Sequence, residues 1–272
     1  MTANTLVTLP RVTPSANVAV AHPTVWYTLH EGTGTTLADA MGYGPNISVS
    51  GTTTGIWTNP GHFTGDGATV YASSGSSTPI DNIFKLSDLD GKHIICGFEI
   101  LRANSAASTE YAFMWGRDAV TAGYGAWAIN FNGTDQPGFL FRGNGASSST
   151  VPTFGLSIGD THTASVQMMV EIFINNGYLE AILYQSTSET AGTVQINLST
   201  YTLPSAAPDG LTLFGRRTSG ATVQQWLGSG SSGSRMNCFF AQKRSAYDPT
   251  IGVLAWNAFK AARREFPSPL RG

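Results

Sequence analysis

Short apolar runs separated by polar, turn-forming clusters cover most of the chain, from Val25 to about Lys243. The clusters consist of Gly, Ser, Thr, Asn and Asp, which are the residues that favour turns between strands. Many short strands at such spacing predict an all-β sandwich or barrel. The predicted strands are Val25–His30, Ile47–Val49, His62–Phe63, Ala68–Ala72, Lys92–Leu101, Tyr111–Gly116, Gly125–Asn130, Gly138–Arg142, Thr163–Ile174, Tyr178–Ser186, Thr193–Leu198, Leu211–Gly215 and Met236–Gln242.

Two segments predict hairpins directly. FINNGYLEAILY places Asn176-Gly177 between two apolar runs, and an Asn-Gly step accepts the positive φ that a tight turn requires. AWAINFNGTDQPGFLF has the same form with a longer loop. The run TASVQMMVEIFI alternates imperfectly, which indicates a strand covered on both faces.

One helix is predicted near the C-terminus. Asp248 is placed to cap it, Pro249 suits its first position, and IGVLAWNAFKAARREF follows. The apolar stripe predicted for this helix consists of Ile251, Leu254, Ala255, Ala258, Phe259 and Ala262.

The chain divides into three parts by composition. Residues 1–23 hold three prolines and little charge, which predicts an extended N-terminal arm outside the core. Residues 24–247 form the predicted sandwich, and residues 248–272 the C-terminal helix and tail. We expect the arm and the basic C-terminal segment to bind partner subunits. The partner-binding side chains expected are Leu6, Val7, Leu9, Arg11, Val12, Lys260, Arg263, Arg264 and Arg271.

Composition excludes several classes of protein. Charged residues are only 12% of the chain, while 31 Gly, 26 Ser and 32 Thr make up about a third of it, which argues against a helical bundle. Six Trp, nine Tyr and 14 Phe can form a core, so the chain as a whole is not disordered. No apolar run is long enough to span a membrane, and MTANTLVTLPRVTP does not read as a secretory signal.

Charge is unevenly distributed along the chain. Residues 31–234 carry seven basic and 15 acidic side chains, a net −8, whereas residues 235–272 carry seven basic and two acidic ones, a net +5. A nucleic-acid-binding domain is usually far more basic, so we expect no nucleic-acid partner. The basic segment reads better as a contact surface for acidic neighbours or as a solvated helix.

No metal site or cofactor is expected. The five histidines form no pair with metal-ligand spacing. Cys96 and Cys238 both lie in apolar runs and predict buried free thiols, with one possible arrangement placing them face to face across the sandwich.

Three strings imitate functional motifs. Gly155–Gly159, with Ser157 at its centre, fits the esterase pattern G-x-S-x-G, but a long β run rather than a helix follows it. Gly228–Gly233 fits G-x-G-x-x-G, yet a strand follows where a dinucleotide site needs a helix. Ser87–Gly91 offers two carboxylates beside a Gly turn without the spaced ligands of a calcium loop, which predicts a plain turn.

The tryptophans are candidates for stacking on sugars, although core packing is the more common use of such residues. They are Trp26, Trp57, Trp115, Trp127, Trp226 and Trp256.

The order of these pieces resembles the laminin-G-like, concanavalin A-like jelly-roll family. WYTLHEGTGTTLADAMGYGPNISVSG is similar to the opening of that family, KHIICGFEILRA to its long sheet strand, and SVQMMVEIFINNGYLEAILYQS to its central hairpin. LTLFGRRTSG and MNCFFAQKRSAYDPTIGVLAW resemble its late and closing strands. The resemblance covers about residues 24–262 and implies a two-sheet antiparallel jelly-roll sandwich.

The family hosts lectins, glycosidases and structural modules, so the fold alone does not determine the function. The glycosidase branch carries E-x-D-x-x-E on one strand, and this sequence has no such string. Of the acids used by the calcium-binding branch, only Asp39 is roughly in place. The resemblance therefore implies a non-catalytic module.

These observations favour a structural or interaction protein of a tailed-bacteriophage virion, a head decoration or a fibre component. It would be made in the host cytoplasm and would bind other virion proteins, copies of itself and surface glycans. The alternative is a carbohydrate-binding module or a glycoside hydrolase of the concanavalin A-like class.

Overall fold

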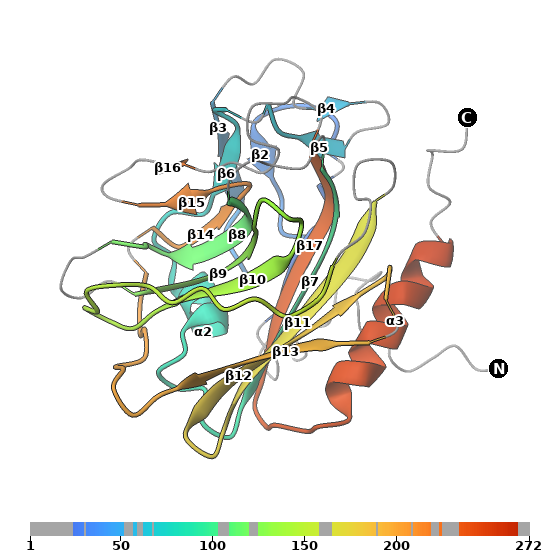
Figure 1. Ribbon diagram of the computed structural model, residues 1–272. Helices are drawn as coiled ribbons and strands as arrows, with labels where there is room; N and C mark the ends of the chain where they lie inside the picture. Colours follow the sequence, from blue (N-terminus) through green and yellow to red (C-terminus); the bar gives the residue numbers. More distant parts are fainter. Residues whose placement is uncertain are drawn as a thin grey trace.

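The computed structural model describes most of the chain between residues 24 and 265. Two antiparallel sheets face each other, and a helix lies against the outer side of one of them (Figure 1). The described residues are 24–29, 31–51, 57–58, 62–66, 68–102, 109–119, 125–157, 165–188, 190–207, 209–218, 223–224 and 234–265. The predicted arm lies outside these residues.

The first sheet, called here the long sheet, contains eight strands within the described residues, in the order β13-β12-β11-β7-β17-β5-β4, with β1 also paired to β17. Every pairing is antiparallel. Its strands are β1 (Thr24–Tyr27), β4 (Trp57–Thr58), β5 (His62–Thr64), β7 (His93–Leu101), β11 (Val166–Asn175), β12 (Tyr178–Gln185), β13 (Gly192–Asn197) and β17 (Arg235–Arg244).

The second sheet, called here the short sheet, has the described order β10-β9-β8-β14-β6-β3-β2 and is also antiparallel throughout. A two-stranded ribbon, β15 (Arg216–Arg217) with β16 (Val223–Gln224), accompanies it. The strands of the short sheet are β2 (Thr36–Leu37), β3 (Ile47–Ser50), β6 (Tyr71–Ser73), β8 (Glu110–Gly116), β9 (Ala126–Phe131), β10 (Pro137–Arg142) and β14 (Leu211–Leu213). The predicted jelly-roll sandwich is thereby confirmed.

The predicted hairpins form as the sequence indicates. Asn176 and Gly177 have φ values of 48° and 80°, and Asn175 pairs with Tyr178 across the turn between β11 and β12. β11 is buried on both faces over most of its length, which explains its imperfect alternation. The short strands β2, β4, β15 and β16 were not predicted, because two-residue strands carry no readable period.

Large aromatic side chains form the centre of the core between the sheets. Phe113 packs edge-on against both Trp127 and Phe239, with ring centroids 5.5 and 5.1 Å away. Rings in such T-shaped pairs add attraction beyond the area that they bury. Trp127 and Trp115 are fully buried, so for these two residues core packing is the correct interpretation.

A short helix that the sequence analysis did not predict, α2 (Thr78–Phe84), closes one end of the core. Trp127 donates a hydrogen bond to the carbonyl of Phe84 at 2.9 Å, and Trp115 donates to Asp81 at 3.0 Å. At seven residues the helix is too short to show a clear amphipathic period.

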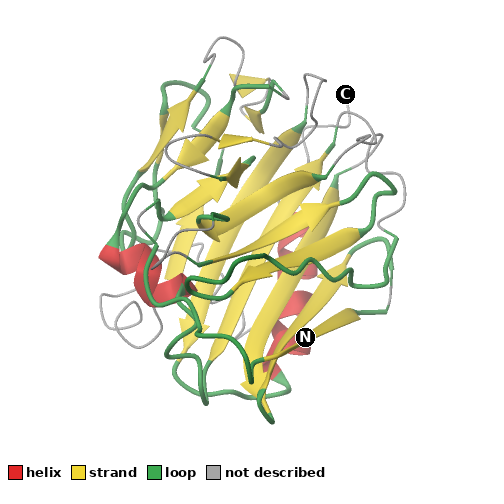
Figure 2. Ribbon diagram, turned by 60° about the vertical axis from the view of Figure 1, so that its left-hand side comes forward, coloured by secondary structure: helices red, strands yellow, loops and turns green. Residues whose placement is uncertain are grey.

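The second helix, α3 (Ile251–Glu265), packs on the outer face of the long sheet, where Figure 2 shows it behind the strands. The side chain of Asp248 accepts hydrogen bonds from the main chain and the hydroxyl of Thr250, just before the helix begins. The predicted stripe is wrong at Leu254, which is 42% exposed, whereas Trp256 is buried. The sheet surface, and not the strongest sequence period, determines which side is covered.

Cys96 and Cys238 are free thiols, as predicted, but only Cys96 is buried, since Cys238 is partly exposed, and the face-to-face arrangement is wrong. Cys96 lies in the core between the sheets, whereas Cys238 contacts the cluster under α3. The two side chains therefore occupy opposite faces of the long sheet, and burial raises the pKa of the Cys96 thiol well above its usual value.

Among the described helices, none is long and apolar enough to cross a membrane.

Candidate functional site

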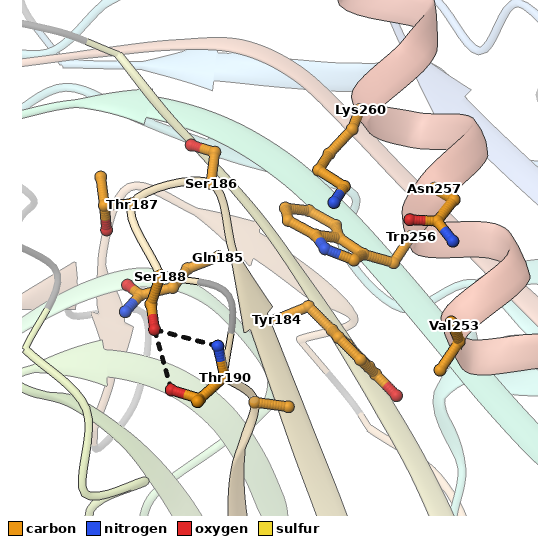
Figure 3. Close-up of a pocket in the computed structure, with 11 residues that line it drawn as sticks. Tyr184, Gln185, Ser186, Thr187, Ser188, Thr190, Val253, Trp256, Asn257 and Lys260 are labelled. Carbon is orange, nitrogen blue, oxygen red and sulfur yellow. Dashed lines mark hydrogen bonds between the residues drawn. The ribbon is translucent and has the colours of Figure 1, made fainter.

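A pocket of about 510 Å³ opens between α3 and the turn that joins β12 to β13. Figure 3 shows side chains from both elements pointing toward it. The described residues that line it are Tyr184, Gln185, Ser186, Thr187, Ser188, Thr190, Ala191, Val253, Trp256, Asn257 and Lys260. Hydroxyl and amide groups predominate among them, and Lys260 is the charged side chain.

Aromatic rings form one wall of the pocket. Tyr184 of β12 stacks on Trp256 of α3 with centroids 6.0 Å apart and planes inclined by 28°. The ammonium of Lys260 lies over the Trp256 ring at 5.2 Å from its centroid. Figure 3 shows Trp256 between these two neighbours, so the indole is fixed and is only 6% exposed.

The opposite wall is the hydroxyl-rich turn after β12. The hydroxyl oxygens of Ser188 and Thr190 form a hydrogen bond at 2.9 Å. The main-chain amide of Thr190 also donates to the Ser188 hydroxyl, at 3.1 Å. Gln185 donates its side-chain amide to the carbonyl of Ser157 at 3.0 Å. These bonds order the turn and keep several hydroxyls at the pocket.

A buried polar cluster behind the aromatic wall fixes Tyr184. Its hydroxyl donates to Glu171 of β11 at 2.7 Å, and the Nε2 atom of His93 lies 2.9 Å from the other oxygen of the same carboxylate. Burial raises the pKa of Tyr184, and the adjacent Glu171 carboxylate raises it further. The phenol therefore stays protonated as a donor, which anchors the ring between Glu171 and the pocket.

A second group of charged residues, called here the arginine network, ties β15 to the short sheet. The buried carboxylate of Asp118 is bound by both Arg142 and Arg216. Arg117 forms a two-bond pair with Asp209 at 2.5 and 2.8 Å. Because Arg216 belongs to β15 and Arg142 to β10, their shared contact with Asp118 joins the ribbon to the short sheet.

The structure brings one of the predicted partner-binding residues to the pocket, namely Lys260. Arg263 and Arg264 lie in the last turns of α3, and nothing further is described of their side chains. The other predicted residues, Leu6, Val7, Leu9, Arg11, Val12 and Arg271, lie outside the described residues.

Most of the pocket was not anticipated. Trp256 was one of six candidates for sugar stacking, but nothing in the sequence connected it with Tyr184, 72 positions earlier in the chain. The run QSTSET after a strand was the available signal, because five hydroxyl or amide side chains lie close together there.

The imitation motifs have structural roles where they are described. Ser157 lies in a loop, and its carbonyl accepts the bond from Gln185. Asp88 pairs with lysines, and Gly91 has a φ of 67° as a turn requires. Asp39 accepts main-chain hydrogen bonds from Trp26 and Gly44 at 2.8 and 2.7 Å.

The glycine-rich string at 228–233 lies outside the described residues. Within the part of the chain that the structure describes, no three His, Cys, Asp or Glu side chains are grouped to hold a metal ion.

Comparison with known proteins finds similar structures but no family or curated protein that is similar in sequence. No family model and no curated protein matches the chain. A structure of botulinum neurotoxin type C, whose cell entry depends on interaction with two ganglioside molecules, matches with a TM-score of 0.53 and 14% identity over 90% of this chain and 53% of that one. Trypanosoma rangeli sialidase in complex with sialic acid matches with a TM-score of 0.53 and 12% identity over 92% and 34%.

A botulinum neurotoxin serotype C1 binding domain matches with a TM-score of 0.53 and 13% identity, over 89% of this chain and 53% of that one. This chain thus spans about half the length of the neurotoxin chains and about a third of the sialidase chain. At such identities the likeness establishes the fold alone, a two-sheet β-sandwich that is also found in these larger proteins.

Proposed function

We propose that the protein is a non-catalytic interaction module that binds carbohydrate in the pocket between α3 and β12. The observation that carries this proposal is the composition of the pocket, in which hydroxyls and amides face a fixed aromatic wall. A sugar offers many hydroxyls around an apolar ring, and a pocket with convergent hydrogen-bonding groups beside aromatic carbon matches both features.

The size and rigidity of the pocket suit a short saccharide. Its volume of about 510 Å³ falls within the range of roughly 300–1,000 Å³ that small-molecule sites occupy. Trp256 and Tyr184 are held by stacking, and Tyr184 also by Glu171. A site that is already ordered loses less conformational entropy when it binds a ligand.

The structural comparisons support the class of ligand. The neurotoxin similar to this chain interacts with gangliosides, and the sialidase similar to it is seen with sialic acid. Those ligands are sugars or carry them, which makes carbohydrate the first class to test here.

We propose a binding role rather than hydrolysis because of the carboxylates. Glycoside hydrolysis ordinarily requires two carboxyl groups flanking the scissile bond. The described lining of the pocket holds no Asp or Glu, and Glu171 lies behind Tyr184 with its side chain only 4% exposed.

The test is a glycan array with the purified protein, followed by calorimetry on the strongest ligands. Ala191→Trp places a large side chain at the pocket lining and should abolish binding. Ala261→Trp is the matched control, because Ala261 is an exposed residue of α3 outside the described lining. Binding that survives Ala191→Trp, or an array with no ligand, would contradict the proposal.

The larger setting of the module stays a prediction. We propose that it belongs to a virion and that residues 1–23, with the basic C-terminal segment, attach it to neighbouring subunits. Deleting residues 1–20 should leave the melting temperature of the isolated domain unchanged and abolish incorporation into a particle. A truncated protein that assembles normally would favour a free binding module instead.

A further inference from the structure

We infer that the pocket selects saccharides that carry a carboxylate, and that Lys260 is the residue that recognises this group. The inference rests on the proposed function and adds the chemical class of the ligand. It starts from the different surroundings of the four lysines in the chain, all of which lie in the described part.

Three of the lysines share one acid, Asp88, in the turn before β7. Lys85 and Lys92 lie 3.6 and 3.3 Å from Asp88, and Lys243 binds the same carboxylate. Lys260 has no such arrangement, since among the described residues no carboxylate pairs with it. Its ammonium is placed over the indole of Trp256 instead.

The contact with Trp256 fixes the ammonium without neutralising it. A ring face attracts a cation through its quadrupole, but it carries no net charge. Lys260 is therefore a cation without a carboxylate partner among the described residues, at the edge of a pocket whose other described lining groups are uncharged. A carboxylate entering the pocket would form a charge-assisted hydrogen bond, which is shorter and stronger than a bond between neutral groups.

Further groups are placed to bind the second oxygen of a ligand carboxylate. Asn257 lies one turn before Lys260 on α3, and residues three apart share a helix face. Both residues line the pocket, and Figure 3 shows their side chains on the side of α3 that faces it. An amide or hydroxyl donor can bind one carboxylate oxygen while the ammonium binds the other.

Fixing Lys260 in advance strengthens this recognition. An unrestrained lysine loses side-chain entropy when it is immobilised. Because stacking on Trp256 already limits the side chain, less of that cost remains when an anion binds.

The experiment compares two acidic saccharides, sialyllactose and a hyaluronan tetrasaccharide, with two neutral ones, lactose and chitotetraose. Calorimetry should show at least one acidic saccharide binding about tenfold or more tightly than both neutral ones. Lys260→Gln should remove that preference, and Lys260→Arg should largely keep it. Lys92→Gln is the control, because it removes a partly exposed lysine outside the pocket lining.

The outcomes separate this inference from the proposed function. If the neutral saccharides bind as tightly as the acidic ones, or if Lys260→Gln leaves the preference intact, carboxylate selection is wrong while carbohydrate binding stands. If none of the four binds, carboxylate selection is wrong, and if the array is also empty, the proposed function is overturned as well. Raising the salt concentration should lower the affinity for the acidic saccharides and leave the affinity for the neutral ones unchanged, since salt screens the contact between charges.

Discussion

Gly252, in the first turn of α3, rests directly against the carboxylate of Glu171 on β11. A methyl group placed on Gly252 would lie 2.0 Å from Oε2 of Glu171, well inside any real contact distance. The same carboxylate accepts the hydroxyl of Tyr184, the residue that forms one wall of the pocket. One acid thus positions the pocket wall and limits how closely the helix can pack on the sheet.

Gly252→Ala should destabilise the protein although alanine is the better helix former. The gain in helix propensity is about 1 kcal/mol, while forcing a methyl group into a packed contact costs about 1–3 kcal/mol, and a rigid buried carboxylate gives little room. Urea unfolding measures the net change. Leu254→Ala, at an exposed position of the same helix, should shift stability by no more than about 0.5 kcal/mol. A more stable Gly252→Ala protein would mean that α3 does not dock as described.

Asp118→Asn should cost about 3–5 kcal/mol of stability. The substitution keeps the shape of the side chain but removes the charge that Arg142 and Arg216 share, and breaking a buried ion pair leaves uncompensated charge behind. Asp90→Asn, at an exposed turn position, is the control and should be nearly neutral. Equal unfolding midpoints for the two variants would show that the arginine network contributes little.

Asp66 should give the protein a pH-dependent stability term at low pH. Burial raises its pKa, but hydrogen bonds from the Thr69 hydroxyl and from the amides of Ala68, Thr69 and Val70 outweigh burial and lower the pKa to about 2. A carboxyl whose pKa is lowered by folding stabilises the protein above its unfolded pKa, near 3.9, and loses that effect as pH falls through about 2.

The measurement is the stability difference between the native protein and Asp66→Asn. We expect roughly 1 kcal/mol near pH 6, a value reduced for solvent screening of a partly exposed group, and about half of it at pH 3. A difference that grows as the pH falls would contradict the assignment.

The two thiols should differ sharply in reactivity. Denatured protein should take up two alkyl groups without any reductant, because the cysteines lie on opposite faces of the long sheet and cannot form a disulfide with each other. In the native protein Cys96 should be protected, since it is fully buried and its raised pKa keeps it a thiol. Mass spectrometry after timed alkylation measures the number of labels in the denatured protein and the rate of labelling in the native one. A mass two daltons too low, with no label attached, would contradict the prediction.

Ser157 should be dispensable for any hydrolytic activity found in a preparation. It lies in a loop and is held through its carbonyl, with no helix start beside it in the described residues to stabilise an oxyanion. Esterase assays on Ser157→Ala should match the native background. Loss of a reproducible activity in that variant would restore the esterase interpretation.

Strand periodicity and turn chemistry predict much of the architecture, because both act over a few neighbouring residues. Asn176-Gly177 predicts its hairpin because the turn needs positive φ at both positions, a requirement local to two residues. The long strands β7 and β11 were predicted for a similar reason, since each is a run of nine or ten mostly apolar residues bounded by polar turns. β17 was predicted from the apolar residues in its middle.

The candidate site could not be predicted in this way, because its residues are distant in sequence and come together only when α3 packs on the long sheet. Tyr184 and Trp256 belong to separate elements, and each looks like an ordinary core residue in its own segment. The covered side of α3 was predicted incorrectly at Leu254, since the shape of the outer sheet face decides which side chains are buried. The longer strands and the tight turns can be predicted from the sequence, because they depend on neighbouring residues. The pocket and the position of Lys260 at its edge depend on long-range packing, which brings distant residues together.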